Sequence, residues 1–405
     1  HQYLDDNPTA TLSDDYTIGL TITDDDTGTS SDTTTVTVDN VAPLLGSLSA
    51  TPIDEHGRTT LTGTITDAGT LDTFTLAVTW GDTLSPDNVE QYTLDAGTTS
   101  FSLTHQYLDD NPTATLSDDY TIGLTITDDD AGTSSDTTTV TVDNVAPLLG
   151  SLSATSIDEH GTTTLTGTIT DPGSADTLTL AVNWGDSLSP DNVEQYTYAA
   201  GTTSFSLTHQ YLDDNPTATL SDDYTIGLAI TDDDTGTTSD TVGVTVDNVV
   251  PLLGNLSATT IDEHGVTTLT GTITDAGTLD SFTLDVSWGD PLSPKNLEQY
   301  TYPPGTKSFA ISHHYLDDHP SGTPRDNYQI GLEITDDDMS RSNDTLKVTI
   351  INVAPLLSGL SAMPIDEHGV TTLTGTISDP GTLDTFTLMV DSGDPLSPDN
   401  TTTHT

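Results

Sequence analysis

Carboxylates are the side chains of this sequence that recur in a pattern capable of chemistry. The chain has 64 Asp and Glu residues against 6 Lys and Arg residues, which gives a formal net charge of −58. The acids gather in turn segments such as 54–57, 67–72 and 128–130. Oxygen ligands in this number, with no His or Cys cluster beside them, suit Ca²⁺ better than Mg²⁺, which prefers a tight octahedron with retained water.

The same composition argues against several functions. A polyanion repels a chain this acidic, so we expect no nucleic acid and no anionic membrane surface as a partner. The absence of Cys excludes a thiolate metal site and a thiol nucleophile. Because no run of 18 apolar residues occurs, we expect no membrane insertion in this segment. Asp54 and Glu55 form a carboxylate pair, but the pair recurs at a turn without a nucleophile and base, and we therefore expect no enzyme.

An internal repeat organises the chain. HQYLDD or HHYLDD begins at His1, His105, His209 and His313, and the proline of an xVxPLL motif recurs at the same interval of 104 residues. This period is the size of a domain rather than of a solenoid repeat. We expect three complete modules, here called the first, second and third repeats, and two partial ones: residues 1–41 as a C-terminal half-repeat, then 42–145, 146–249 and 250–353, and residues 354–405 as an N-terminal half-repeat.

Within one repeat, apolar residues alternate with polar ones. Phe74, Leu76, Val78 and Trp80 follow this period of two, and so do the apolar residues of 120–126. Turn residues separate such runs, and no stretch has helical periodicity, so the pattern predicts half-buried antiparallel strands with Thr on the solvent face. About seven short strands in about 100 residues predict an all-β chain of tandem immunoglobulin-like β-sandwiches, forming an extended rod.

Three motifs in order resemble the PKD (polycystic-kidney-disease) domain. They are Trp80-Gly81-Asp82, then His105-x-Tyr107, then Tyr120-Thr-Ile-Gly-Leu-Thr-Ile-Thr-Asp, and they recur in the second and third repeats. The chain departs from the family at Thr83, where a Gly is usual, and in the acidic insert 108–119. The resemblance implies tandem PKD-like sandwiches of a bacterial or archaeal surface protein, which serve as spacer or adhesion modules without catalysis. It also implies that His105 is a structural strand residue rather than a metal ligand.

Strand direction assigns each acidic turn to one end of a repeat, and the two ends that meet at a linker are both acidic. Like charges this close repel unless a cation lies between them. We therefore expect several Ca²⁺ ions at the junctions between repeats. The candidate ligands are Asp39, Asn40, Asp54, Glu55, Asp67, Asp72, Asp109, Asp110, Asp128, Asp130, Asp143, Asn144, Asp158, Glu159, Asp171, Asp176, Asp213, Asp214, Asp232, Asp234, Asp247, Asn248, Asp262, Glu263, Asp275, Asp280, Asp336 and Asp338.

The layout of these acids also resembles the junctions of cadherins. There, a Glu of an early turn, a linker Asp-Asn before Ala-Pro, and two Asp-bearing loops of the next domain bind calcium together. The matching positions here are Glu55, then 143–147, then Asp171 and 232–234. At the last junction Ile351 replaces the linker Asp, so we expect weaker binding there. An alternative interpretation is that the acids are solubility charge or a halophilic adaptation.

These observations favour an extracellular, cell-surface protein with a structural or adhesive role, in which calcium stiffens a rod that is part of a surface fibre or giant adhesin. Its expected partners are other copies of itself, and a surface glycan or a neighbouring cell. The alternative is a carbohydrate-binding or spacer region of a secreted multidomain enzyme. The half-repeats indicate either a window of a longer repeat protein or strand complementation between copies, in which 16–22 and 33–38 of one chain complete the C-terminal half-repeat of another.

Overall fold

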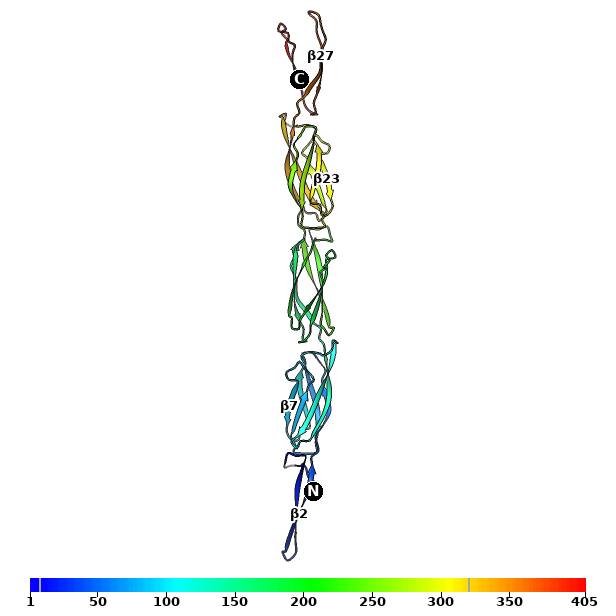
Figure 1. Ribbon diagram of the computed structural model, residues 1–405, viewed down its shortest axis with the longest axis vertical. Helices are drawn as coiled ribbons and strands as arrows, with labels where there is room; N and C mark the ends of the chain where they lie inside the picture. Colours follow the sequence, from blue (N-terminus) through cyan, green and yellow to red (C-terminus); the bar gives the residue numbers. More distant parts are fainter. Residues whose placement is uncertain (7–8, 320) are drawn as a thin grey trace. The chain divides into compact units, whose positions relative to one another are not determined.

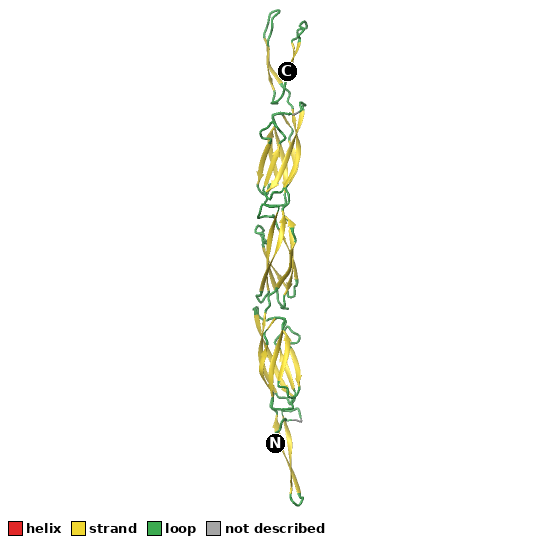
Figure 2. Cartoon of the chain, turned by 180° about the vertical axis from the view of Figure 1, so that it is seen from behind, coloured by secondary structure: helices red, strands yellow, loops and turns green. Residues whose placement is uncertain are grey.

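The computed structural model describes residues 1–6, 9–319 and 321–405, and every regular element of these residues is a β-strand (Figures 1 and 2). They divide into two compact units: one comprises His1–Ala154, Leu165–Leu207 and Thr225–Val242, and the other comprises Thr155–Thr164, Thr208–Tyr224 and Gly243–Thr405. The junction of the first and second repeats lies within the first unit, and that of the second and third repeats lies within the second. Among the described residues, no helix has the length and apolar character needed to span a bilayer.

The first repeat is a sandwich of a three-stranded sheet and a five-stranded sheet. The sheet orders are β3-β5-β8 and β4-β10-β9-β6-β7. The pairs are antiparallel, except that β4 runs parallel to β10. The neighbouring strands β3 and β4 therefore belong to opposite sheets. The bounds are β3 Leu44–Ala50, β4 Ile53–Asp54, β5 Arg58–Thr66, β6 Phe74–Thr79, β7 Val89–Leu94, β8 Ser100–Gln106, β9 Ser117–Asp128 and β10 Thr133–Asp143.

The core of the first repeat lies between the two sheets. Leu76, Trp80, Ile122 and Ile126 are fully buried there, because alternate residues of each strand point inward. The period-two pattern therefore predicted the inward face correctly. At the edge of the core, the Tyr120 hydroxyl donates to the carbonyl oxygen of Asp109 at 2.9 Å, which ties an acidic loop to the sandwich. That loop is shorter than expected, since β9 begins at Ser117.

The other two repeats have the same sheet orders, so the prediction of an all-β chain of tandem sandwiches is confirmed. The predicted boundaries between the repeats stay a prediction. The strands of the second repeat are β11 Leu148–Ala154, β12 Ile157–Asp158, β13 Thr162–Thr170, β14 Leu178–Asn183, β15 Val193–Tyr198, β16 Ser204–Gln210, β17 Ser221–Thr231 and β18 Thr237–Asp247. Those of the third are β19 Leu252–Ala258, β20 Ile261–Asp262, β21 Val266–Thr274, β22 Phe282–Ser287, β23 Leu297–Tyr302, β24 Ser308–His314, β25 Arg325–Asp336 and β26 Arg341–Ile351.

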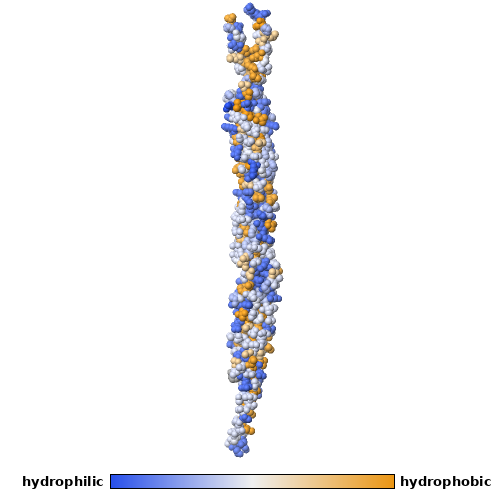
Figure 3. Space-filling model, in the orientation of Figure 1, coloured by the Kyte–Doolittle hydropathy of each residue, from blue (hydrophilic) through white to orange (hydrophobic). Residues whose placement is uncertain are grey.

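The half-repeats contain only part of a sandwich. The N-terminal one is a hairpin of β1 Ser13–Thr23 and β2 Thr29–Asp39. The C-terminal one has two antiparallel pairs, β27 Leu356–Ala362 with β28 Leu373–Ser378, and β29 Leu388–Asp391 with β30 Thr401–His404. Hydrophobic residues lie on the surface of the C-terminal half-repeat (Figure 3). Likewise Ile22 is 73% exposed, whereas its equivalent in the first repeat, Ile126, is fully buried.

Candidate metal centres

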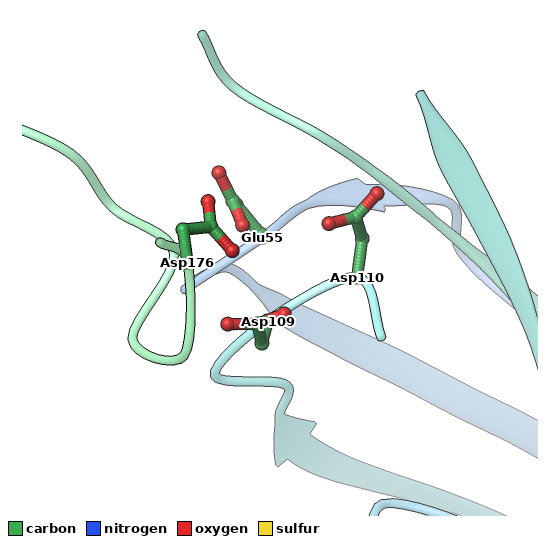
Figure 4. Close-up of side chains that lie close together, drawn as sticks. All are labelled: Glu55, Asp109, Asp110 and Asp176. Carbon is green, nitrogen blue, oxygen red and sulfur yellow. The ribbon is translucent and has the colours of Figure 1, made fainter. Parts of the chain in front are cut away.

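Four carboxylates converge where the first repeat meets the second, here called the first junction. Glu55 follows β4, Asp109 and Asp110 lie in the loop after β8, and Asp176 lies in the loop between β13 and β14. One carboxylate oxygen from each of the four lies within 4.8 Å of the others. Figure 4 shows Asp176 of the second repeat beside Glu55, with Asp109 and Asp110 on the loop of the first repeat. Oxygens on opposite sides of a calcium ion are about 5 Å apart, since Ca–O distances are about 2.3–2.6 Å.

Burial and backbone amides hold these carboxylates in place. Asp110 is 0% exposed, and Asp109, Asp176 and Glu55 are 1–3% exposed. The amide of Val145, in the linker, donates to Glu55 Oε1 at 2.9 Å. The amide of Ala175, in the second repeat, donates to Asp109 Oδ2 at 2.6 Å. The acids of the first repeat are therefore bound both to the linker and to the loop that carries Asp176.

Many oxygens at the first junction lack a hydrogen-bond partner among the described residues. They are Glu55 Oε2 and both carboxylate oxygens of Asp110, Asp171 and Asp176. Asn144 adds one more, because its Nδ2 donates to Asp232 Oδ2 at 3.1 Å and its Oδ1 is buried without a donor. Buried polar atoms are nearly always paired, and leaving one unpaired is costly. These oxygens are suited to bind a cation.

The electrostatics agree with this assignment. Burial, with Asp110 and Asp171 nearby, raises the pKa of Glu55 to about 8. Burial raises the pKa of Asp176 to about 9, with a further contribution from the charge of Glu55. The pKa of Asp110 is raised to about 7 by burial and by Asp234 and Asp109. Without a cation, these carboxyls are therefore partly protonated near neutral pH.

The second junction, between the second and third repeats, repeats this geometry. Glu159, Asp275 and Asp280 bring oxygens within 4.8 Å of one another. The amide of Val249 donates to Glu159 Oε1 at 2.8 Å, and Asn248 Nδ2 donates to Asp336 Oδ2 at 3.1 Å. Burial raises the pKa of Glu159 to about 8, with a further contribution from the charge of Asp275. Burial also raises the pKa of Asp280 to about 9, with a further contribution from the charge of Glu159. An acidic group therefore recurs at the second junction, where its members include Asp275, the equivalent of Asp171.

The acids that alternate outward are not brought into these groups. Asp54 is exposed while Glu55, the next residue, is buried, and Asp54 lies beside Asp143 in the pairing of β4 with β10. The exposed candidates are Asp39, Asp54, Asp143, Asp158, Asp247 and Asp262. The buried ones are Glu55, Asp72, Asp109, Asp110, Asp128, Asp130, Glu159, Asp176, Asp213, Asp214, Asp232, Asp234, Glu263, Asp280, Asp336 and Asp338. The half-buried ones are Asn40, Asp67, Asn144, Asp171, Asn248 and Asp275.

Further acidic groups lie where the half-repeats meet the full repeats, and the candidate ligands predicted above omit several members of two of them. Asp5 joins Asp72 and Asp130 in one group, and Asp317, Asp318 and Asp384 join Glu263 in the other. The 104-residue interval could have identified Asp5 as a candidate ligand, because Asp5 lies one period before Asp109. The expected weakening of the last junction rested on Ile351, but its equivalent Asp143 is exposed, so that substitution removes no buried acid.

His105 lies in the core and away from the junctions. Its ring stacks on Trp80, with ring centroids 4.7 Å apart, and its Nε2 lies 3.5 Å from Asp82 Oδ2. Burial lowers the pKa of His105, which favours the neutral ring. In the third repeat, the equivalent His313 Nε2 lies 3.2 Å from Asp290 Oδ2. These contacts agree with a structural strand residue.

No protein-family model matches the chain, and no curated protein matches it. The resemblance to the PKD domain therefore stays a prediction. Among solved structures, the chain is similar to a tetra-tandem repeat in the extending region of a large adhesion protein, with 20% identity over 84% of this chain and 82% of that chain, at a TM-score of 0.47. It is also similar to Escherichia coli alpha-2-macroglobulin activated by porcine elastase, with 12% identity over 85% of this chain and 37% of that chain, at a TM-score of 0.20. A third similar structure is dimeric latent PorU from Porphyromonas gingivalis, with 12% identity over 76% of this chain and 34% of that chain, at a TM-score of 0.20. With every TM-score below 0.5, these similarities carry no argument about function.

Proposed function

We propose that the chain is a structural and adhesive repeat protein of the cell surface, in which Ca²⁺ ions join neighbouring repeats. The single observation that carries this proposal is the set of buried, unpartnered carboxylate oxygens at the first junction, on Glu55, Asp110, Asp171 and Asp176. A closed protein interior does not leave so many acceptors unpaired unless a cation completes them.

The donor set favours calcium among common divalent ions. Every candidate ligand is an oxygen, from carboxylates or from the carboxamide of Asn144. Zinc prefers nitrogen and sulfur, and magnesium retains several waters, whereas calcium accepts six to eight oxygens in flexible geometry. No Lys or Arg occurs between Arg58 and Lys295, so no basic side chain of that segment can compensate these charges.

Ion binding has a mechanical consequence, because the ligands come from both sides of the linker. Glu55, Asp109 and Asp110 belong to the first repeat and Asp176 belongs to the second. Two like charges about 4 Å apart repel by about 4 kcal/mol at an effective dielectric of about 20. A bound dication reverses this repulsion and holds the two repeats in one relative orientation. The function supported here is therefore spacing and display rather than catalysis.

Self-association and an extracellular location are part of the proposal. Leu360, Ile377 and Phe386 of the C-terminal half-repeat are 37–61% exposed, while Ile273 and Phe282, the equivalents of the last two, are 3–4% exposed. The hairpin of β1 and β2 carries the strands that cover such a face in a full repeat. We propose other copies of this chain as its partners in a surface fibre. A surface glycan or a neighbouring cell is the proposed external partner.

Solution scattering and thermal melting test the calcium mechanism. Metal-free protein is measured first, then the same protein with excess CaCl₂ and, as a control, with MgCl₂. Calcium is expected to raise the melting temperature and to narrow the distribution of interatomic distances toward one extended form, with a smaller effect of magnesium. If calcium changes neither quantity, the mechanism is wrong. Sedimentation velocity over a range of protein concentrations tests self-association, and a constant monomer would contradict it.

A further inference from the structure

One aspartate takes part in two acidic groups at the same junction. Where the N-terminal half-repeat meets the first repeat, Asp5, Asp72 and Asp130 bring oxygens within 4.8 Å of one another. Asp67, Asp72 and Asp128 form a second group by the same criterion, and Asp72 is the one residue that these two groups share. The two groups differ in origin, since Asp5 comes from the half-repeat whereas Asp67, Asp72 and Asp128 all belong to the first repeat.

Both oxygens of this shared aspartate are unsatisfied. Asp72 is 1% exposed, and neither its Oδ1 nor its Oδ2 has a hydrogen-bond partner among the described residues. The same holds for its equivalents Asp176 and Asp280, which are 2% and 1% exposed. One ion satisfies both oxygens only by bidentate binding, but Asp72 belongs to two separate acidic groups, which favours one oxygen on each of two ions. A carboxylate that lies between two ions in this way leaves neither oxygen unpaired.

We propose that each full junction holds two Ca²⁺ ions and that the shared aspartate bridges them. At the first junction, the bridging residue is Asp176. The spanning ion is bound by Glu55, Asp109 and Asp110 of the first repeat, together with Asp176. The internal ion is bound by Asp171 and Asp232, the equivalents of Asp67 and Asp128, together with Asp176. This inference rests on the proposed function and gives its ions their number and their ligands.

The charge of the first junction also favours more than one ion. Six carboxylates there are at most 5% exposed, and Asp171 has both oxygens buried. One dication leaves most of this charge uncompensated in a poorly solvated site, and that is unfavourable. Two dications, together with the amides that donate to Glu55 Oε1 and Asp109 Oδ2, leave far less of the negative charge uncompensated. The six buried carboxylates belong to Glu55, Asp109, Asp110, Asp176, Asp232 and Asp234.

The two ions have different roles in this arrangement. The internal ion has carboxylate ligands from the second repeat alone, so it orders the loop that carries Asp176. Asp232 is held from both sides of the linker, since its Oδ1 accepts the amide of Gly236 at 2.6 Å and its Oδ2 accepts Asn144 Nδ2 of the first repeat. The spanning ion then joins this ordered loop to the first repeat. Joining the repeats therefore depends on both ions.

Counting the bound ions by native mass spectrometry of the full chain in calcium tests the proposal. The variants are Asp110→Asn for the spanning ion, Asp171→Asn for the internal ion and Asp176→Asn for both. The control is Asp136→Asn, since Asp136 is exposed on β10 and accepts the amide of the next residue, Thr137, at 2.8 Å. Near-ultraviolet circular dichroism of the buried tryptophans checks that each variant is folded.

Asp110→Asn and Asp171→Asn are each expected to lose one ion relative to the wild type, Asp176→Asn two, and Asp136→Asn none. If Asp176→Asn loses no more ions than Asp110→Asn does, the bridge is overturned while the calcium mechanism stands. If the wild type binds no calcium, the proposed function itself is wrong. These two failures are distinguishable, because only the second removes all ions from the unmodified chain.

Discussion

The interior of the first repeat and the first junction are both buried, but they treat polar groups differently. Inside the sandwich, Trp80 Nε1 donates to Glu90 Oε2 at 2.7 Å, and the Tyr107 hydroxyl donates to the Trp80 carbonyl at 2.7 Å. At the junction, Glu55 Oε2 and both oxygens of Asp176 have no partner among the described residues. The difference teaches that these interior side chains find their partners within one repeat, whereas the junction leaves acceptors unpaired, which is where we propose that a cation binds.

The largest effect on stability is expected from a substitution in the hydrophobic core. Trp80 is fully buried, so Trp80→Ala should lower the free energy of unfolding of the first repeat by about 3–5 kcal/mol. The loss should be similar with and without calcium, because the side chain lies in the core. Denaturant unfolding in both conditions measures this. A loss seen only in calcium would show that the interior and the junction are not independent.

Adding a methyl group at the junction gives the next effect. A Cβ at Gly173 would lie 2.2 Å from Asp176 Oδ2 and 2.5 Å from Glu55 Oε2, inside the space where the two repeats meet. Gly173→Ala should therefore weaken calcium binding at this junction by about 10–100-fold, which is the usual cost of disturbing the support of metal ligands. Calorimetric titration measures it. Gly227→Ala is the matched control, since a Cβ there meets no atom within 4 Å, and an equal effect of both variants would contradict the prediction.

The pH dependence of the metal-free protein comes third. In the folded state, the pKa of Glu55 is about 8 and that of Asp176 about 9, both raised first by burial. The folded state therefore binds more protons than the unfolded state between about pH 4 and 9, and stability must fall as pH rises through this range. The melting temperature of metal-free protein should be lower at pH 9 than at pH 6. Saturating calcium should reduce that difference, and an unchanged difference would contradict the assignment.

The smallest effect is expected from Asp54→Asn. Asp54 is exposed beside buried Glu55, so its substitution should change stability by less than about 0.5 kcal/mol and leave calcium binding intact. Glu55→Gln, the matched variant one residue away, should weaken calcium binding. Titration of both proteins with calcium compares them. Equal binding by the two variants would mean that burial does not select the ligands.

The sequence alone predicted the sandwiches and the acidic junctions because both follow from periodicity. Alternation placed Leu76 and Trp80 inside, and the repeat placed acids at both ends of each sandwich. It could not separate Asp54 from Glu55, since the face that each residue occupies depends on how the short strand β4 pairs with β10. The role of Gly173 was equally invisible, because it depends on two loops of different repeats meeting.

The linker of the first junction has little structure of its own. Asn144 and Val145 are half-buried, and their side-chain and backbone donors point to Asp232 and Glu55. If those acids separate when calcium is withdrawn, the linker backbone becomes accessible to proteases at every junction. The lifetime of the protein would then follow the calcium content of its surroundings, and degradation would release whole sandwiches rather than random fragments.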